Sequence, residues 1–181
     1  MIDAQQRYEE SVEEDGGDAP VENVSTFDIV SASRSDAPVL LTGRAQDAEA
    51  LAREIHSLSG WRHGRFVVLD CASLAEDELI GVLQRLLFPE PYPSGRPEPR
   101  LRQDGTLLLR NVERLPLRAQ RIVSDWLETG SASTVRRAGR RLMATASSSL
   151  LPAVLAGRFD EGVYYRLNVL HLILPVEAGR M

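Results

Sequence analysis

The residues best placed to do chemistry lie between positions 38 and 50, in the run Pro-Val-Leu-Leu-Thr-Gly-Arg-Ala-Gln-Asp-Ala-Glu-Ala. A short apolar strand there leads through Gly43 into the start of a helix. This is the arrangement in which backbone N–H groups and a helix N-terminus hold phosphate groups. Such loops normally add more glycines and a lysine, but this run has no second glycine and the whole chain contains no lysine. The pattern predicts a phosphate-binding fold whose binding residues are missing.

Other reactive side chains are scattered. His56, His63 and His171 have no carboxylate or cysteine partners at ligand spacing, so we predict no metal site. The serines at 147–149 lack a nucleophile elbow and a histidine partner, which excludes a serine-hydrolase arrangement. Cys71 is the single cysteine, which excludes an internal disulfide and suits a reducing cytoplasm.

The elements that would position these residues alternate between short apolar runs and amphipathic stretches. This alternation is typical of an α/β domain with a mainly parallel sheet. Helical spacing of apolar residues predicts helices over 47–58, 76–87 and 117–129, and Ser73 with Glu76 predicts a capping box for the second. The predicted strands are Val39–Thr42, Phe66–Asp70, Thr106–Val112, Arg141–Ala146 and Val169–Leu174.

Five prolines between positions 89 and 99 exclude a helix and a central strand there. The segment predicts an exposed, stiff connector, with a polyproline recognition element as the alternative. Arg136, Arg137, Arg140 and Arg141 form a basic cluster, for which a solvated turn and a contact with nucleic-acid phosphates are both open.

Charge is divided unevenly along the chain. Residues 1–36 hold ten acidic residues and two arginines, whereas 37–181 hold sixteen acidic residues and nineteen arginines. The first segment has too little apolar surface to offset its ordering entropy, which predicts a disordered or loosely helical acidic tail at 1–36 and a folded domain at 37–181. The tail would act as a solubilising leader or as a docking arm for a basic partner. No signal peptide or membrane-spanning run is present, so we expect a cytoplasmic protein.

From Pro38 onward the chain resembles, segment by segment, the central ATPase domain of bacterial sigma-54-dependent transcription activators, an AAA+ family. The segments that carry this resemblance are Pro38–Gly43, Ala52–Ser59, Phe66–Leu74, Asp104–Leu109, Leu115–Gln120, Gly157–Phe159, Tyr164–Val169 and Leu174–Pro175. The resemblance implies a three-layer P-loop NTPase-like parallel sheet with strand order 5-1-4-3-2.

The residues that carry chemistry in that family are replaced here. The resemblance puts Glu49 in the position of the loop lysine and Ala50 beside it, within a vestigial loop that also includes Gly43, Arg44 and Asp47. The remaining family positions follow in chain order. The acidic pair at the end of the third strand falls on Arg110 and Asn111, the sensor asparagine on Ser147, and the first of two intersubunit arginines on Asp160, whereas the second, Arg166, is kept.

The proline-rich segment occupies the place of the family's sigma-54-contacting loop without its motif. The family's helical lid and DNA-binding helix-turn-helix have no counterpart in this sequence. Together these losses lead us to expect a degenerate AAA+ core, a pseudoenzyme without ATP or magnesium as cofactor and without direct DNA binding.

Such a core would act in transcription regulation or signalling through protein-protein interaction. The expected interaction residues are Arg158, Phe159, Tyr164, Tyr165 and Arg166, and the expected partners are another AAA+ subunit, a transcription or signalling protein, or a second copy of the chain. The alternative is a weak ATP-binding or ATP-hydrolysing regulator, with Arg44 as a substitute cation. A decaying gene fragment is a third possibility, and it predicts poor solubility.

Overall fold

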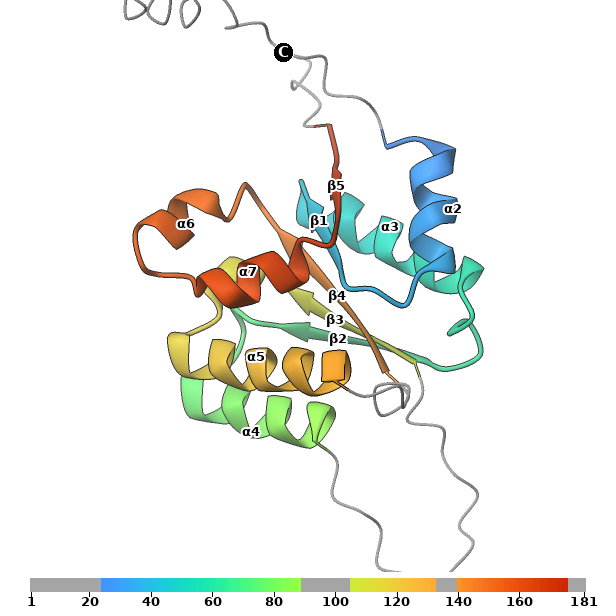
Figure 1. The fold of residues 1–181 in the computed structure, drawn as a ribbon. Coiled ribbons are helices and arrows are strands. Elements are labelled where there is room, and N and C mark those ends of the chain that lie inside the picture. The colour runs from blue at the N-terminus through green and yellow to red at the C-terminus, as the bar shows by residue number, and fades with distance from the viewer. Residues whose placement is uncertain (1–23, 89–104, 133–139, 176–181) are drawn as a thin grey trace, which may run out of the picture.

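The computed structural model describes residues 24–88, 105–132 and 140–175 (Figure 1). The proline-rich segment at 89–99, Arg136, Arg137 and most of the acidic tail lie outside the described residues. In chain order the elements are α2 (Thr26–Arg34), β1 (Val39–Thr42), α3 (Ala45–Leu58), β2 (Arg65–Asp70), α4 (Glu76–Leu87), β3 (Gly105–Arg110), the 3-10 turn η1 (Val112–Arg114), α5 (Leu117–Ala132), β4 (Arg140–Ala146), α6 (Leu151–Leu155), α7 (Glu161–Leu167) and β5 (Leu170–Ile173).

The five described strands form one parallel sheet in the order β2-β3-β4-β1-β5. Read from the other edge, this is the predicted order 5-1-4-3-2, so the predicted fold class is confirmed. β1 lies between β4 and β5, with Leu40 beside Ala144 and His171. The carboxyl ends of all five strands therefore meet at one edge of the sheet, which we call the carboxyl edge.

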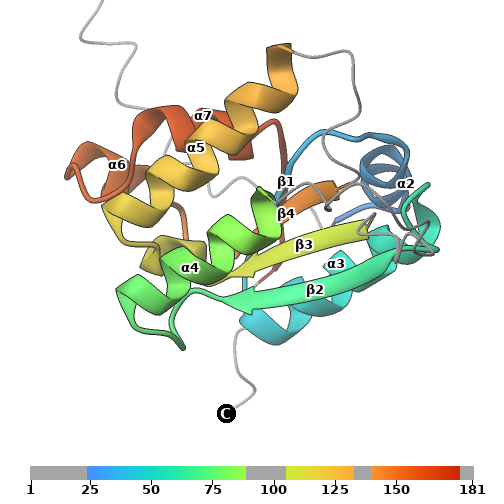
Figure 2. The ribbon, with the colours of Figure 1, turned by 90° about the horizontal axis from the view of Figure 1, so that it is seen from below.

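Helices cover both faces of the sheet (Figure 2). On one face, Leu107 and Leu109 of β3 pack with residues of α4, α5 and α7. On the other face, Leu108 packs with residues of α2 and α3. The alternation follows from the two-residue period of a strand, and each fully buried leucine contributes roughly 1.5–3 kcal/mol. The sheet is thus buried on both faces, as parallel sheets require.

The folded part begins earlier than predicted. α2 lies within the range 1–36 that was predicted as a tail, and it packs on α3 with Ala32 and Ser33 buried. A capping box between Ser25 and Asp28 starts this helix, since each residue accepts a hydrogen bond from the other's backbone N–H. The part of the chain packed on the sheet therefore includes α2, which lies before residue 37.

Two other local predictions fail. α4 begins after Ala75, without a side-chain cap, and the hydroxyl of Ser73 donates to the carbonyl of Asp70 instead of capping the helix. Arg141 does not lie in a solvated turn, because only 1% of it is exposed. Its position is taken up below.

Candidate functional site at the carboxyl edge of the sheet

Gly43 forms the turn that leads from β1 into α3, and its geometry requires glycine. Its φ is +154°, and an added Cβ would lie 2.8 Å from the Cβ of Leu174. Its N–H donates to the carbonyl of Ala146 at 3.0 Å, which holds the turn against β4. The backbone of a phosphate-binding turn is thus present.

The side chains at the start of α3 do not suit a phosphate. Arg44 forms an ion pair with Asp47 at 2.7 Å, and Asp47 lies in the first turn, where a helix dipole favours negative charge. Ala50 is exposed and offers no hydroxyl. The carboxylate of Asp47 therefore already provides the negative charge that the N-terminal end of α3 favours.

Arg110 joins the family's lysine position to the end of β2. Its Nη1 lies 3.1 Å from Oε2 of Glu49, and its Nη2 lies 2.7 Å from Oδ2 of Asp70. These two carboxylates are about one-fifth exposed, and the guanidinium side chain is 35% exposed. The other oxygen of Glu49 accepts from Arg53 at 2.7 Å. One cation thus lies between two carboxylates at the place where a phosphate-binding loop would face its metal ion.

Asn111 fixes the same network from the next position. Its backbone is left-handed, at φ 56° and ψ 51°, a conformation that asparagine tolerates better than most residues. The turn aims its side chain at Asp70, and Nδ2 donates to Oδ1 at 2.9 Å. Both carboxylate oxygens of Asp70 are therefore occupied by neighbouring donors.

The network shifts the titration of its members. Burial favours the protonated form of Asp70, but hydrogen bonds from the N–H of Ala72, from Arg110 and from Asn111 outweigh it, and the pKa of Asp70 is lowered. The pKa of Glu49 is lowered chiefly by the hydrogen bond from Arg53, with Arg110 assisting. The pKa of Arg110 is raised, first by its bond to Asp70. All three groups are charged at neutral pH.

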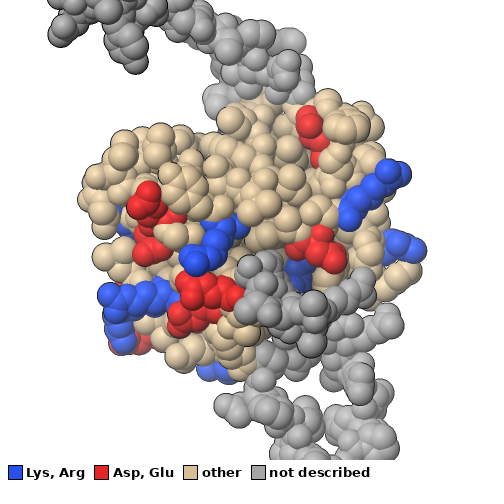
Figure 3. Space-filling model, in the orientation of Figure 1, with Lys and Arg blue, Asp and Glu red and all other residues tan. Residues whose placement is uncertain are grey.

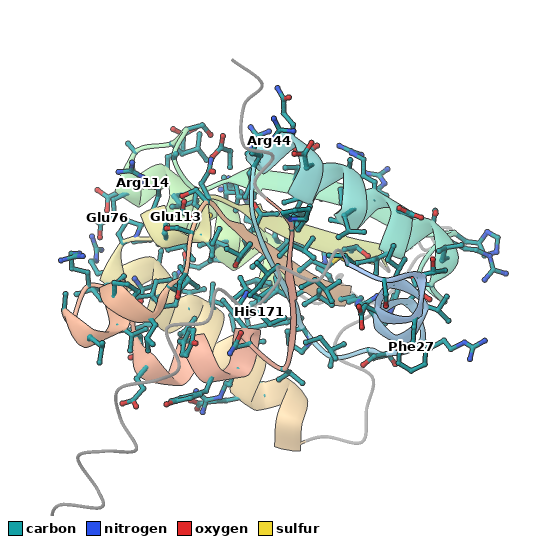
Figure 4. All side chains as sticks on the ribbon, turned by 90° about the horizontal axis from the view of Figure 1, so that it is seen from above. Phe27, Arg44, Glu76, Glu113, Arg114 and His171 are labelled. Atoms are coloured by element: carbon teal, nitrogen blue, oxygen red, sulfur yellow. The ribbon has the colours of Figure 1, made fainter. Side chains whose placement is uncertain are left out.

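The remaining family positions also have structural roles. Ser147 donates to Oε1 of Glu113 from its hydroxyl at 2.6 Å and from its N–H at 3.1 Å. Figure 4 shows Glu113 at the carboxyl edge, and its Oε2 is buried without a hydrogen-bond partner. Asp160 caps α7 by accepting from the N–H of Val163 at 2.9 Å. Ser147 therefore links the end of β4 to η1, and Asp160 stabilises the start of α7.

The predicted interaction residues divide by burial. Phe159 is 2% exposed and belongs to the core, so it is not a surface contact residue. Arg158 is exposed, Tyr164 is half-buried, and Tyr165 is 63% exposed. Arg166, the retained arginine, pairs with Glu128 at 2.9 Å, from α7 to α5 of the same chain. Three of the five side chains remain well placed to meet a partner.

The donor set at this edge does not fit a magnesium-bound triphosphate. Within residues 24–88, 105–132 and 140–175 no three His, Cys, Asp or Glu side chains come together as a metal site. The six charges near the turn pair with one another, three of each sign. They are Arg44 with Asp47, Arg53 with Glu49, and Arg110 with Glu49 and Asp70.

Sequence reasoning identified Glu49, Arg110 and Asn111 as altered positions but missed the partners that make them a network. The sequence pattern marks Asp70 only as the end of a strand, and it does not mark Arg53 or Glu113. The sequence does carry a signal for the pair of Glu49 and Arg110. Glu49 is an acid where the family has a lysine, and Arg110 is a base where the family has an acid, so the two replacements are complementary in charge.

Comparison with known proteins agrees with the fold and the order of segments. A family model described as the Sigma-54 interaction domain matches residues 18–173. The probable regulatory protein HrpS of the pathogenicity locus of Pseudomonas savastanoi pv. phaseolicola is 38% identical over 176 residues, a match that covers 87% of this chain and 56% of HrpS. The regulatory protein AtoC of Escherichia coli K12 is 33% identical over 162 residues, covering 82% of this chain and 34% of AtoC. The chain thus spans little more than half of one relative and a third of the other.

Solved structures give the same fold. NtrX from Brucella abortus in complex with ADP superposes with a TM-score of 0.65 at 23% identity, covering 84% of this chain and 35% of NtrX. The P-loop NTPase domain of a sigma-54 activator from Escherichia coli gives a TM-score of 0.59 at 19% identity, covering 83% of this chain and 92% of that domain. In the described part of the chain no helix is long and apolar enough to cross a membrane.

Proposed function

Because the chain belongs to the sigma-54 interaction domain family of AAA+ proteins, we propose that it is a pseudo-ATPase that regulates transcription or signalling by binding other proteins. The observation that carries this proposal is the bridge from Glu49 through Arg110 to Asp70. In an active site of this class a lysine faces the phosphates and carboxylates hold magnesium. Here the lysine position holds the acid Glu49 and an acidic position holds the base Arg110, and these two side chains form an ion pair.

The electrostatic cost of binding a nucleotide supports this proposal. A unit charge of like sign at 4 Å costs about 4 kcal/mol at an effective dielectric constant of 20, or about a thousandfold in affinity. Glu49 would impose a smaller cost of this kind on a triphosphate, because Arg53 and Arg110 pair with its carboxylate. A nucleotide could use Arg44, Arg53 or Arg110 only by breaking an existing ion pair.

A protein partner could use the face formed by α6, α7 and β5. Figure 3 shows an uncharged area over α6 and β5, with charged side chains beside it over α7. The exposed apolar side chains here include Leu155 at 80%, Tyr165 at 63% and Val169 at 57%. Apolar exposure with an aromatic residue is typical of interaction surfaces. We propose another AAA+ subunit or a transcription protein as the partner.

Calorimetric titration with Mg-ATP, run beside a thermal-shift assay, tests the absence of nucleotide binding. We expect neither heat nor a shift in Tm at millimolar Mg-ATP. The matched variant Glu49→Lys/Arg110→Asp/Asn111→Glu restores the family's charges and should gain measurable affinity. A low micromolar Kd for the unmodified chain, with a matching rise in Tm, would replace the proposal with the nucleotide-dependent regulator and lead to hydrolysis assays.

Capture of partners from a sigma-54-containing bacterium, with light scattering on the purified chain, tests the interaction role. Tyr165→Arg should abolish capture, whereas Phe27→Arg should not, because Phe27 is 77% exposed on α2, away from this face (Figure 4). A strictly monomeric chain that captures no AAA+ or transcription protein would contradict the proposal.

A further inference from the structure

Arg141 lies at the start of β4, at the opposite edge of the sheet from the Glu49–Arg110 bridge. Only 1% of the residue is exposed, although its guanidinium carries a full charge. Its Nη2 donates to the carbonyl of Ala32 in α2 at 2.5 Å. Its Nε and Nη1 are buried without hydrogen-bond partners. The side chain thus reaches from the sheet to α2 with several N–H groups unused.

No ion pair compensates this charge within residues 24–88, 105–132 and 140–175. The acidic side chain that acts on it electrostatically is Asp36, whose Oδ1 accepts from Nε1 of Trp61 at 2.9 Å. Burial lowers the pKa of Arg141 to about 10, with Asp36 opposing, so the group remains protonated at neutral pH. A buried charge without a counterion is strongly unfavourable, and a water molecule can accept its N–H bonds without neutralising it.

The described neighbours of Arg141 include polar side chains. Thr106 lies beside it on β3. The Oγ1 of Thr106 lies 2.8 Å from Nδ1 of His56, whose pKa is lowered by burial first and by Arg141 second. His56 is therefore neutral at pH 7, and Ser33 adds a further buried hydroxyl group to this region. Among the described residues, two titratable groups interact electrostatically with the guanidinium of Arg141: Asp36 raises the pKa of Arg141, and Arg141 lowers the pKa of His56.

From this geometry we infer that Arg141 is a binding site for an oxyanion, a carboxylate or a phosphate, between α2 and the start of β4. A planar guanidinium matches these groups in charge and shape. The anion can come from solution or from a glutamate of the acidic segment at residues 1–23. This inference is independent of the proposed pseudo-ATPase role, since it concerns the other edge of the sheet.

Thermal unfolding of the full chain in sodium phosphate, against sodium chloride at matched ionic strength, tests the site. A free anion predicts a rise in Tm that grows with the logarithm of the phosphate concentration above the Kd and reaches about 5 °C at roughly fifty times the Kd. Arg141→Met should abolish the rise. Arg141→Lys keeps the positive charge but loses the paired N–H donors of the guanidinium, so it should weaken phosphate binding at least tenfold. This variant replaces Arg141→Met in the test if the methionine variant does not fold. Arg118→Met, at an exposed ion pair, is the control that should respond like the unmodified chain.

A second arm separates the two sources of the anion. The full-length variant Glu9→Gln/Glu10→Gln/Glu13→Gln/Glu14→Gln removes four carboxylates. If the chain supplies its own anion, phosphate should stabilise this variant and not the unmodified chain, and adding Arg141→Met should abolish the effect. The inference is overturned if neither form responds to phosphate, or if Arg141→Met responds as strongly as the parent.

Discussion

Replacing Arg110 by methionine should destabilise the fold, because the methionine keeps a similar apolar stem but leaves Glu49 and Asp70 without their common cation. Fully exposed ion pairs contribute about 0–1 kcal/mol, and hydrogen bonds to charged groups about 1.5–3 kcal/mol. The Arg110 side chain is 35% exposed, so we discount the larger figure for solvent screening to about 1 kcal/mol for each contact. The variant should lose about 2 kcal/mol, or about 4–8 °C in Tm for a domain of this size.

The loss should depend on pH. Glu49 and Asp70 have pKa values lowered by folding, so their stabilisation is present above the unfolded values, about 4.3 and 3.9, and is lost as pH falls through the folded values. The difference in stability between the parent and Arg110→Met should thus be greatest near pH 7 and should shrink below about pH 4.

Urea unfolding of both proteins from pH 3 to pH 8 measures this difference. Arg118→Met is the matched control, because Arg118 pairs with Glu76 and Asp77 at a position where its side chain is 66% exposed. The control should change stability by less than about 0.5 kcal/mol. The reasoning is refuted if Arg110→Met is no less stable than this control at pH 7, or if the difference does not vary with pH.

Three further outcomes follow from individual side chains. Asp160→Ala should cost about 1 kcal/mol in urea unfolding because it removes the cap of α7, and Asp160→Asn should restore most of it. Leu107→Ala should cost about 2–5 kcal/mol, since Leu107 is fully buried, and a loss below 1 kcal/mol would contradict its place in the core. Cys71 should react with a thiol reagent only as fast as the protein opens, because burial raises its pKa to about 12, and rapid labelling in the native state would refute this.

Much of the fold could be predicted from local patterns. The strand Val39–Thr42 and the helix Glu76–Leu87 were predicted to the residue, because a continuous apolar run and a 3.6-residue apolar period are strong signals. The predicted third strand extends two residues too far, to Val112, since the left-handed backbone of Asn111 ends β3 at Arg110. α2 was missed because its acidic neighbours dominate the composition, although Ser25 and Asp28 carried a capping signal.

The candidate site was less predictable, for a physical reason. Glu49 and Arg110 lie 61 positions apart, and nothing local in either segment indicates the other. For Arg141 the local sequence pattern gives a prediction, but the prediction is wrong. A cluster of arginines is usually solvated, but the strand register puts this one beneath α2, where tertiary packing decides its burial.

Under the proposed pseudo-ATPase role, the Glu49–Arg110 pair also bears on whether a nucleotide site could be regained. A lysine restored at position 49 alone would face the guanidinium of Arg110 at the distance now spanned by a 3.1 Å ion pair, so two cations would meet. An aspartate restored at position 110 alone would face Glu49 and Asp70, so three carboxylates would meet. Each single step back crosses an unfavourable intermediate, and only a coordinated exchange avoids it. Under that proposal, selection for stability alone would keep Glu49 and Arg110 from being replaced one at a time.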